Sequence, residues 1–420
     1  EQELVMKDGV VFVDKISHGS IPREYVPSVQ HGVRNASASG ILGGYPMVNV
    51  CCELVDGSYH EVDSSQVAFE QAGALGFREA CTKAGLALLE PIMKVIITGG
   101  GGFLGSQLAE ALLARGELTG ASGKAEPIKQ LVLLDARFGS QLEDSRVRQL
   151  EGDVSEPAKI REAVEGSNSF SIFHLASMVS GECEERYDDA LKVNLDGGRY
   201  VFDAARQAAG RPRVVFASSI ASFGGEDMPT PVTDHTKHTP RTTYGTTKAM
   251  CELLLNDHVR KGHFDGRTAR LPTVIIRPCQ PNAAASSWAS GMFREPLKGE
   301  VCKLPVRRSQ SHPMTGFSTV VESFISLHEM PEDKLGDDRG FCLPAHQVTP
   351  EMAESVLSEV ASECGLTLGA IEDAFDECIQ DIVDSWPTDV DGSRAVALGL
   401  PKPPPLKEII CQYLETFGKD

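Results

Sequence analysis

The chain has 420 residues, of which 41% are hydrophobic and 24% are charged, and its formal net charge is −19 at pH 7. This length predicts two or three domains, and the composition is typical of a globular protein with a sizeable core. No apolar run approaches the ~18 residues that a membrane span needs, and no part of the chain carries the basic excess that drives binding to DNA or RNA through counterion release.

The N-terminus and the cysteines bear on where the protein resides. EQELVMKDGV is charged and lacks the apolar core of a secretory signal, and the missing initiator Met predicts a fragment or a trimmed chain. The 11 cysteines are scattered and form no CxxC pair, so we expect neither a disulfide framework nor a zinc site, and a cytoplasmic location fits best. His235 and His238 form an HxxH in a stretch rich in Pro and Thr, which we interpret as a surface loop and not as a metal site.

Residues 1–93 predict a small α/β layer. PREYVPSVQHGVRNASASG predicts a helix with one apolar face, made by Tyr25, Val26, Val29 and Val33. PMVNVCCELVDGSYHEVDSS predicts a strand, an Asp-Gly turn and a polar loop. SQVAFEQAGALGFREACTKAG predicts a second helix, whose inward side chains would be Phe69, Ala72, Leu75 and Phe77. The layer carries no catalytic constellation, so the residues alone indicate a binding or structural module.

A nucleotide-binding unit begins directly after residue 93. KVIIT (94–98) is typical of a buried strand, and it leads through GGGGFLG into the helical pattern of SQLAEALLARG. Strand, glycine turn and helix in this order predict a dinucleotide-binding fold. Gly99 would make the tight turn, Gly102 would let the backbone approach the pyrophosphate, and Gly105 would let helix and strand pack closely. The pyrophosphate would face the N–H groups of the helix start, at Phe103 and Leu104.

Three further strands extend this pattern. QLVLLDA (130–136) ends in Asp135, whose carboxylate would accept hydrogen bonds from the adenosine ribose and repel a 2′-phosphate. NAD is therefore favoured over NADP, a preference that Arg137 would soften. LEGDVSE and SIFHLAS predict the next strands, and their ends would line the adenine and nicotinamide sides with Asp153, Val154, Leu175 and Ala176. The alternation of strands and helices predicts a Rossmann doubly wound parallel sheet.

VVFASSIASFGG and TTYGTTKAMCELLL carry the predicted chemistry. The first is a strand that ends in Ser218 and Ser219, and the second begins a helix with Tyr244 and Lys248 one turn apart on one face. A phenol with a pKa of about 10 is a poor base at neutral pH. An ammonium group beside it, together with a positive nicotinamide, would stabilise the phenolate, and a serine at the strand end would fix the substrate hydroxyl.

The motif TGxxGFxG (98–105), the strand-end serine and the YxxxK pair together resemble the extended short-chain dehydrogenase/reductases, over residues 93 to about 418. RLPTVIIRPCQPNAAASSWASGMFREPL resembles the substrate segment of the D-erythronate dehydrogenase group, and SWPTDVDGSRAVALGL resembles its C-terminal signature. The resemblance implies an NAD-binding core at about 94–278 and a smaller substrate-binding subdomain within about 279–420. It also implies NAD as cofactor, a small sugar acid as substrate, and a homodimer.

The resemblance assigns roles to individual residues. Ser219, Tyr244 and Lys248 take the catalytic roles, Asn194 matches the asparagine on the cofactor side, and Pro278 would touch the nicotinamide.

The substrate would meet the PNAAASS segment, and the implied contacts are Asn282, Ser286 and Ser287, besides Ser219 and Tyr244. Arg277 and Arg294 either form surface ion pairs or hold the substrate carboxylate with a bidentate fork, and we take Arg294 into the predicted site. The chain departs from the group at Cys279 and Gln280, where Gly and Lys are usual, and at Trp288, where Phe is usual. Losing a Lys beside an anionic substrate puts in doubt which acid fits.

Residues 10–94 resemble domain IV of translation elongation factor G, through FVDKISHGSIPREYVPSVQHGV, SGILGGYPMVNV, LVDGSYHEVDSS, AFEQAG and LLEPIMK. In that family the domain tip reaches the ribosomal decoding centre, and His18 and His60 match tip positions. The Gly-rich first strand of that domain is replaced by EQELVMKDG, which would leave an open sheet edge, and no GxxxxGK[ST] loop provides a GTP site. We therefore expect two unrelated units, 1–93 and 94–420, that meet at Met93.

Three functions follow, and the first is favoured. It is NAD-dependent oxidation of a small sugar acid, D-erythronate at its 2-hydroxyl, by a dehydrogenase fused to a truncated ribosome-binding module. A nucleotide-sugar epimerase or dehydratase would use the same core but return the hydride. A ribosome-binding elongation-factor fragment would carry the enzyme as a passenger. No DNA or membrane partner is expected.

Overall fold

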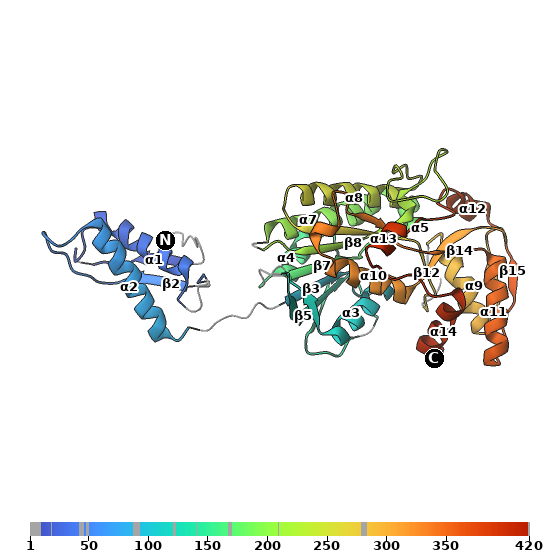
Figure 1. Ribbon diagram of the computed structural model, residues 1–420, viewed down its shortest axis with the longest axis horizontal. Helices are drawn as coiled ribbons and strands as arrows, with labels where there is room; N and C mark the ends of the chain where they lie inside the picture. The colour runs from blue at the N-terminus through green and yellow to red at the C-terminus, as the bar shows by residue number, and fades with distance from the viewer. Residues whose placement is uncertain are drawn as a thin grey trace. The chain divides into compact units, whose positions relative to one another are not determined.

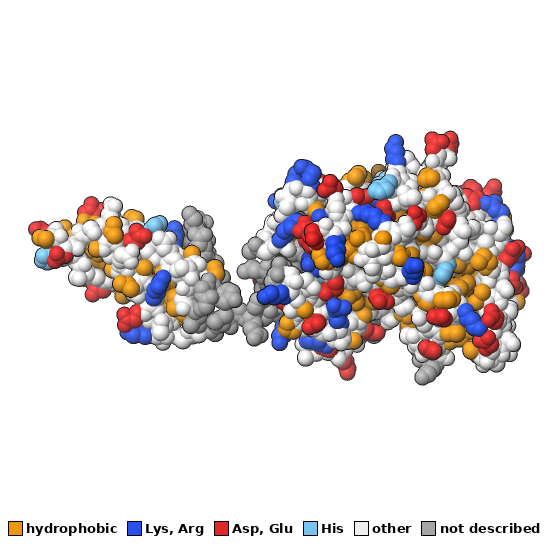
Figure 2. Space-filling model, in the orientation of Figure 1, with side chains coloured by type: hydrophobic (Ala, Val, Ile, Leu, Met, Phe, Trp, Pro, Cys, Tyr) orange, Lys and Arg blue, Asp and Glu red, His pale blue; other side chains and the backbone are white. Residues whose placement is uncertain are grey.

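The computed structural model describes residues 10–17, 19–41, 46–47, 50–86, 93–120, 123–139, 141–166, 170–208, 210–278 and 284–418. The chain divides into two compact units, Glu1–Glu90 and Pro91–Asp420, which are described separately (Figure 1). Among the helices of these residues, none is long and apolar enough to cross a bilayer. On the face shown in Figure 2, basic and acidic side chains are interspersed over the larger unit.

The N-terminal unit is a two-stranded parallel sheet with two long helices. Strands β1 (Val10–Asp14) and β2 (Val50–Leu54) pair along their whole length. A 3-10 turn (Arg23–Tyr25) leads into α1 (Val26–Ser39), and α2 (Gln66–Ala84) follows β2. Ser65 caps α2, since its Oγ accepts a hydrogen bond from Ala68 N at 3.1 Å.

The face that α2 buries differs from the predicted one. Phe69 and Phe77 are buried as expected, but Ala72 is exposed and the side chain of Leu75 is 65% exposed. The buried side of α2 instead follows a strict spacing of four residues, through Phe69, Gly73, Phe77 and Cys81. A methyl group on Gly73 would lie 2.6 Å from the carbonyl oxygen of Val29, so α1 and α2 pack through backbone at this point and not through large side chains.

The C-terminal unit contains the predicted doubly wound sheet. Its strands lie in the order β13-β9-β8-β7-β3-β5, with β6 and the short β4 both paired to β5. Their bounds are β3 Met93–Thr98, β4 Glu117–Thr119, β5 Ala125–Asp135, β6 Val147–Glu151, β7 Phe170–His174, β8 Arg213–Ser219, β9 Asp265–Leu271 and β13 Gly340–Cys342. All pairs are parallel except β4 with β5. Because strand order reverses between β3 and β7, a crevice opens at their carboxyl ends, where such sheets bind ligands.

Helices cover both faces of this sheet. One face packs against α3 (Phe103–Arg115) and α10 (Phe317–Glu329), and the other against α4 (Pro157–Val164), α7 (Gly197–Gln207) and α8 (Thr243–Arg260). Figure 1 shows α7 and α8 on the side of the sheet away from α3. Gly116 ends α3 in the left-handed conformation. Short helices α5 (Ser180–Glu185) and α6 (Tyr187–Ala190) and a π-helical turn (Leu191–Asp196) precede α7.

A smaller subdomain with its own core is built from the segments beyond β9. It holds a three-stranded sheet of β10 (Thr273–Ile275), β12 (His312–Gly316) and β14 (His346–Val348), and a pair of β11 (Cys302–Leu304) and β15 (Ile371–Asp373). Its helices are α9 Ser287–Leu297, α11 Pro350–Cys364, α12 Glu377–Asp384 and α14 Leu406–Phe417, with the short α13 Ser393–Ala397 nearer the main sheet. Thr349 caps α11, on which Leu357 and Val360 are buried and Met352 is exposed.

The close approach of α1 and α2 gives a test of the smaller unit. A methyl group at Gly32 would overlap the carbonyl oxygen of Glu70, whereas one at Gly76 would meet nothing within 4 Å. Gly32→Ala should destabilise the unit by about 1–3 kcal/mol, because the helices must separate. Gly76→Ala, the matched control, should stabilise it by roughly 0.5–1 kcal/mol through helix propensity. Hydrogen exchange of the α1 and α2 amides in the full chain measures both, and equal effects of the two changes would contradict the packing described.

Candidate active site

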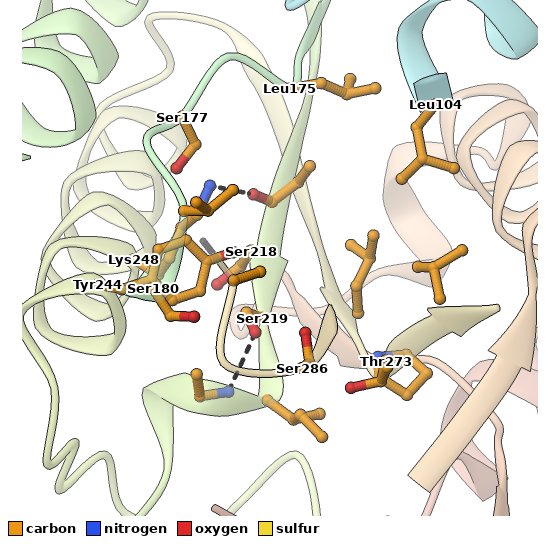
Figure 3. Close-up of a pocket in the computed structure, with 18 of the residues that line it drawn as sticks. Leu104, Leu175, Ser177, Ser180, Ser218, Ser219, Tyr244, Lys248, Thr273 and Ser286 are labelled. Carbon is orange, nitrogen blue, oxygen red and sulfur yellow. Dashed lines mark hydrogen bonds between the residues drawn. The ribbon is translucent and has the colours of Figure 1, made fainter. Parts of the chain in front are cut away.

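A cavity of about 380 Å³ lies at the carboxyl ends of the central strands. Its wall combines the glycine loop after β3, the segment after β7, the end of β8, the start of α8, and residues of the smaller subdomain (Figure 3). Of the predicted site residues, the cavity is lined by Gly99, Gly102, Phe103, Leu104, Gly105, Leu175, Ser219, Tyr244, Lys248 and Ser286. The main sheet therefore brings most of the predicted cofactor and catalytic residues to one place.

The glycine loop leaves no room for side chains. Gly99 has a φ of 75°, and a methyl group on it would lie 2.8 Å from Ala176 N. A methyl group on Gly105 would overlap the carbonyl oxygen of Gly99, so turn and helix touch through backbone. Gly102 precedes α3, and no side chain of the described residues caps this helix start. Backbone N–H groups that face a glycine cradle suit a dinucleotide pyrophosphate, so these residues fit the predicted cofactor.

Asp135 lies at the edge of the same loop. Its carboxylate accepts hydrogen bonds from Gly101 N at 3.0 Å and from Arg137 N at 3.3 Å. The side chain is half-buried at the end of β5, where a ribose would be recognised in this fold. The carboxylate thus tightens the loop, a second role that the sequence did not indicate.

Four other residues predicted on the cofactor side do not line the cavity. Asp153 accepts a hydrogen bond from Ser155 N at 2.8 Å, and Val154 is buried beside Gly197. Ala176 N donates to Thr98 Oγ1 at 3.3 Å. Pro278 is half-buried and lies outside the lining residues. These contacts shape the strand ends around the cavity.

Asn194 is also behind the cavity wall. It is 4% exposed within the π-helical turn, and its Oδ1 accepts a hydrogen bond from Met178 N at 2.7 Å. Its side-chain nitrogen lies 3.4 Å from Thr247 Oγ1 on α8. Met178 itself lines the cavity. The amide of Asn194 therefore holds the segment after β7 against α8, next to the predicted catalytic helix.

Lys248 is the most deeply buried of the three predicted catalytic residues. Its Nζ donates to the carbonyl oxygen of Ala217 at 2.8 Å and lies 5.5 Å from the centre of the Tyr244 ring. Ser219 Oγ accepts a hydrogen bond from Ala221 N at 3.1 Å, and Ser219 acts to lower the pKa of Tyr244. Figure 3 shows Ser219, Tyr244 and Lys248 gathered on one side of the cavity.

A glycine that the sequence did not single out makes this arrangement possible. Thr242 caps α8, its Oγ1 accepting from Gly245 N at 3.1 Å. A methyl group on Gly245 would overlap the carbonyl oxygen of Ala221, just after β8. The start of α8 can therefore approach the end of β8 only because the residue after Tyr244 has no side chain.

Burial governs the acidity of the Tyr-Lys pair. It raises the pKa of Tyr244 to about 12, although Ser219 acts in the opposite direction. It lowers the pKa of Lys248 to about 8. The sequence predicted a phenol acidified by the amine, but in the protein alone desolvation is the largest effect on the pKa of Tyr244, and the groups that lower this pKa are Ser219 and Arg277. The prediction also included a positive nicotinamide, whose charge would lower the phenol pKa further.

Behind Ser219, a buried polar network supports the end of β8. Ser218 Oγ donates to a carboxylate oxygen of Glu252, and Arg270 Nε donates to the other oxygen at 2.9 Å. Arg270 also donates to the carbonyl oxygen of Asp234 at 3.0 Å, and Arg394 pairs with the Asp234 carboxylate at 3.1 Å. None of this was predicted, because the partners are far apart in sequence.

The HxxH interpretation was wrong for one of its residues. His238 stacks on Phe223 with ring centres 5.1 Å apart, and its Nε2 lies 3.4 Å from the buried Glu252 carboxylate. It belongs to the network behind β8, whereas His235 is exposed. Within the described residues, no three His, Cys, Asp or Glu side chains cluster as metal ligands would.

The arginine predicted to bind the substrate, Arg294, does not line the cavity. Arg294 is 5% exposed, pairs with Glu295 and donates to the carbonyl oxygen of Arg277 at 3.0 Å, away from the lining residues. The cavity is lined by Arg277 and Ser286. It is also lined by three residues that were not predicted, Thr273, His312 and Trp386. Asn282 lies outside the described residues.

The predicted tip residues belong to the N-terminal unit. His60 is exposed, with its Nδ1 at 3.3 Å from the carboxylate of Asp63. His18 lies outside the described residues. All residues that line the cavity are in the C-terminal unit.

Comparisons with known proteins agree with this division. Residues 2–85 match the family model of elongation factor G, domain IV, and residues 95–332 match that of the NAD dependent epimerase/dehydratase family. A D-erythronate dehydrogenase of Cupriavidus necator is 40% identical over 330 residues, which cover 78% of this chain and 99% of that protein. One of Haemophilus influenzae is 39% identical, over 77% of this chain and 99% of that protein.

The chain belongs to the NAD dependent epimerase/dehydratase family. A solved structure described as the nucleoside-diphosphate-sugar epimerase of Agrobacterium tumefaciens is 34% identical, covers 80% of this chain and 98% of its own, and superposes with a TM-score of 0.70. Both predicted resemblances and the fold class are confirmed. A member of this family uses a nicotinamide cofactor, and the glycine loop described above is the part of this chain that fits it.

The buried ammonium of Lys248 predicts a measurable cost in stability. Because its pKa falls from 10.5 to about 8 on folding, the unfolded chain binds more protons than the folded one between these values, and stability rises with pH in that window. Lys248→Met should therefore stabilise the C-terminal unit at pH 7, by up to about 3 kcal/mol, and the gain should shrink between pH 8 and pH 10.

Thermal unfolding of both proteins across this pH range measures the effect. Lys402→Met, which removes an exposed lysine of the same unit, is the control and should give no gain that depends on pH. A constant difference between wild type and Lys248→Met from pH 7 to pH 10 would argue against the shifted pKa.

Proposed function

We propose that the C-terminal unit is an NAD-dependent dehydrogenase that oxidises a small sugar acid, D-erythronate at its 2-hydroxyl. The observation that carries the proposal is the meeting of Ser219, Tyr244 and Lys248 with the glycine loop in one cavity. The names of the two relatives that are 40% and 39% identical over nearly their whole length support the choice of substrate.

The proton steps follow from the side chains present. Tyr244, as phenolate, accepts the proton of the substrate's 2-hydroxyl. A hydride leaves the carbon that carries this hydroxyl, so the product is a keto acid. Ser219 hydrogen-bonds that oxygen and fixes its position between phenol and cofactor. Lys248 supplies a positive charge near the phenolate and a donor for the ribose. Bound NAD supplies the hydride acceptor and a cationic ring.

The carboxylate of the substrate calls for a cation in the same cavity. Arg277 lines it, and its charge lowers the pKa of Tyr244, against the larger effect of burial. A guanidinium can bind a carboxylate through two parallel hydrogen bonds. We assign this role to Arg277, which lines the cavity, in place of Arg294, which does not.

The alternative within the family is an epimerase or dehydratase, which returns the hydride to the substrate. The relatives named D-erythronate dehydrogenase, 40% and 39% identical to this chain, favour the smaller substrate. Net formation of NADH separates the two reactions, because an epimerase accumulates none.

The central test is removal of the phenol. Tyr244→Phe should lower the rate of NADH formation from D-erythronate by about 10²–10⁴-fold, the usual contribution of a general base, and leave NAD binding intact. Tyr187→Phe, at an exposed tyrosine of the same unit, is the matched control. An unchanged rate in Tyr244→Phe, or no NADH from wild type with any four-carbon sugar acid, would rule the proposal out.

The preference for NAD rests on the charge of Asp135. Asp135→Asn keeps an oxygen that can accept from Gly101 N but removes the repulsion of a 2′-phosphate. The ratio of kcat/KM with NAD to kcat/KM with NADP should fall by about tenfold, equivalent to the loss of about 1.4 kcal/mol of discrimination. Glu143→Gln removes an exposed carboxylate nearby in sequence and should leave the ratio as in wild type. Equal ratios in all three proteins would assign the preference elsewhere.

Ribosome contact by the N-terminal unit stays a hypothesis that rests on the match to the elongation-factor domain. The exposed His60 imidazole has an acidic neighbour, Asp63, at 3.3 Å. Residues 1–93 also carry twice as many acidic as basic side chains. Both features disfavour contact with RNA phosphates, so binding would depend on shape.

A further inference from the structure

One part of the cavity wall is explained neither by cofactor binding nor by the proton steps. Thr273, His312 and Trp386 all line the cavity, although they come from β10, β12 and the segment after α12. Figure 3 shows Thr273 and Ser286 on the side of the cavity away from Leu104 and Leu175, which belong to the cofactor end. Thr273 therefore lies toward the part of the cavity left for the substrate, and His312, which hydrogen-bonds it, and Trp386, next to His312, belong to the same part of the wall.

Two buried ring nitrogens in this wall lack partners. His312 is 1% exposed and Trp386 is 6% exposed. Among the residues that the structure describes, His312 Nδ1 and Trp386 Nε1 have no hydrogen-bond partner. The other nitrogen of His312, Nε2, is fixed by Thr273 Oγ1 at 2.6 Å, so the imidazole cannot turn freely to find one. The two rings lie side by side, with their centres 5.9 Å apart.

Such nitrogens are costly unless a ligand satisfies them. A buried polar atom without a partner loses its hydration and gains nothing in return, and most buried polar groups in proteins are therefore paired. An indole N–H can only donate, whereas an imidazole nitrogen without hydrogen can only accept. A hydroxyl group offers both an acceptor oxygen and a donor hydrogen, the two functions that these nitrogens lack.

The charge state of His312 favours a hydroxyl over a carboxylate. Burial lowers the pKa of His312 to about 4, so the ring is neutral near pH 7. Two neutral nitrogens would recognise an anion poorly, and the same cavity already has a guanidinium, that of Arg277. The guanidinium thus suits the carboxylate of a polyhydroxy acid, and the neutral nitrogens suit one of its hydroxyl groups.

We propose that His312 and Trp386 bind a hydroxyl of the substrate other than the one oxidised, and so select polyhydroxy acids over simple 2-hydroxy acids. Trp386 Nε1–H donates to the oxygen of that hydroxyl, and His312 Nδ1 accepts its hydrogen. Thr273 holds the required form of the imidazole by accepting a hydrogen bond from Nε2. This inference rests on the proposed function, because it takes the substrate to be a sugar acid.

The chain contains an internal control for this assignment. Trp288 is also 6% exposed, its Nε1 also lacks a partner among the described residues, and its ring centre is 5.8 Å from that of His312. Unlike Trp386, it does not line the cavity. A loss that came only from disturbed packing around His312 would appear in both tryptophan variants.

The test compares two acids that differ only in the remote hydroxyls. D-erythronate has hydroxyls at C2, C3 and C4, and 2-hydroxybutanoate of the same C2 configuration has only the first. Trp386→Phe removes the N–H donor and keeps an aromatic ring. It should lower kcat/KM for D-erythronate by about three- to tenfold, the usual effect of one neutral hydrogen bond, and leave that for 2-hydroxybutanoate unchanged.

A second variant guards against a folding defect. His312→Gln keeps a polar group that can reach Thr273 but loses Nδ1, and it should show the same selective loss. Trp288→Phe should change both acids equally or neither. Where turnover of 2-hydroxybutanoate is slow, its inhibition constant against D-erythronate gives the same comparison.

The outcomes separate this inference from the proposed function. Turnover of D-erythronate by wild type, with equal losses on both acids in Trp386→Phe and His312→Gln, overturns the inference and leaves the dehydrogenase intact. The absence of NADH formation by wild type with either acid overturns both. A loss confined to D-erythronate in the two variants, and not seen in Trp288→Phe, supports the inference.

Discussion

The geometry of the site depends on a buried ammonium group. Lys248 Nζ is removed from water, sits 5.0 Å from the centre of the Phe216 ring and keeps one hydrogen bond to a protein atom, the carbonyl oxygen of Ala217. Desolvation of an ammonium is unfavourable, and the lowered pKa of Lys248 records that cost. The bond to Ala217 joins α8 to the end of β8, so the interaction that partly offsets the cost also sets the distance between Tyr244 and Ser219. Stability is reduced at the point where reactivity is needed.

A second buried set of charges keeps the end of β8 in place. The carboxylate of Glu252, on α8, is held between Ser218 and Arg270, which belong to β8 and β9. Asp234, in the segment between β8 and α8, and Arg394, on α13, extend the set. Because each charge has a partner, removal of one would leave another buried and unpaired, which is far more costly than the pair is worth. Ser219 is thus positioned by its neighbour's contacts as much as by its own.

Local patterns in the sequence correctly predicted the strand, glycine loop and helix that form the cofactor half of the site. GGGGFLG, the strand before it and the helix after it are contiguous, so spacing alone indicated where backbone must meet backbone. The sequence failed where a side chain's surroundings come from distant segments. Leu75 was expected to face inward on α2, yet it is 65% exposed, because the buried side of this helix follows a spacing of four residues. Arg294 was chosen over Arg277 since nothing local reveals that Glu295 folds back on it.

The substrate half of the site could not be predicted from the sequence, because its side chains come from distant segments. The cofactor half and the substrate half are therefore held in place differently. The cofactor end is fixed by backbone contacts at Gly99, Gly105 and Gly245, where any side chain would collide with a neighbouring carbonyl or amide. A change there disturbs the whole crevice. The substrate end is fixed by single side-chain atoms on separate segments, as at His312 and Trp386. One such side chain can be substituted without moving the sheet. The fold can therefore keep its cofactor site while the polar groups that contact the substrate change one at a time.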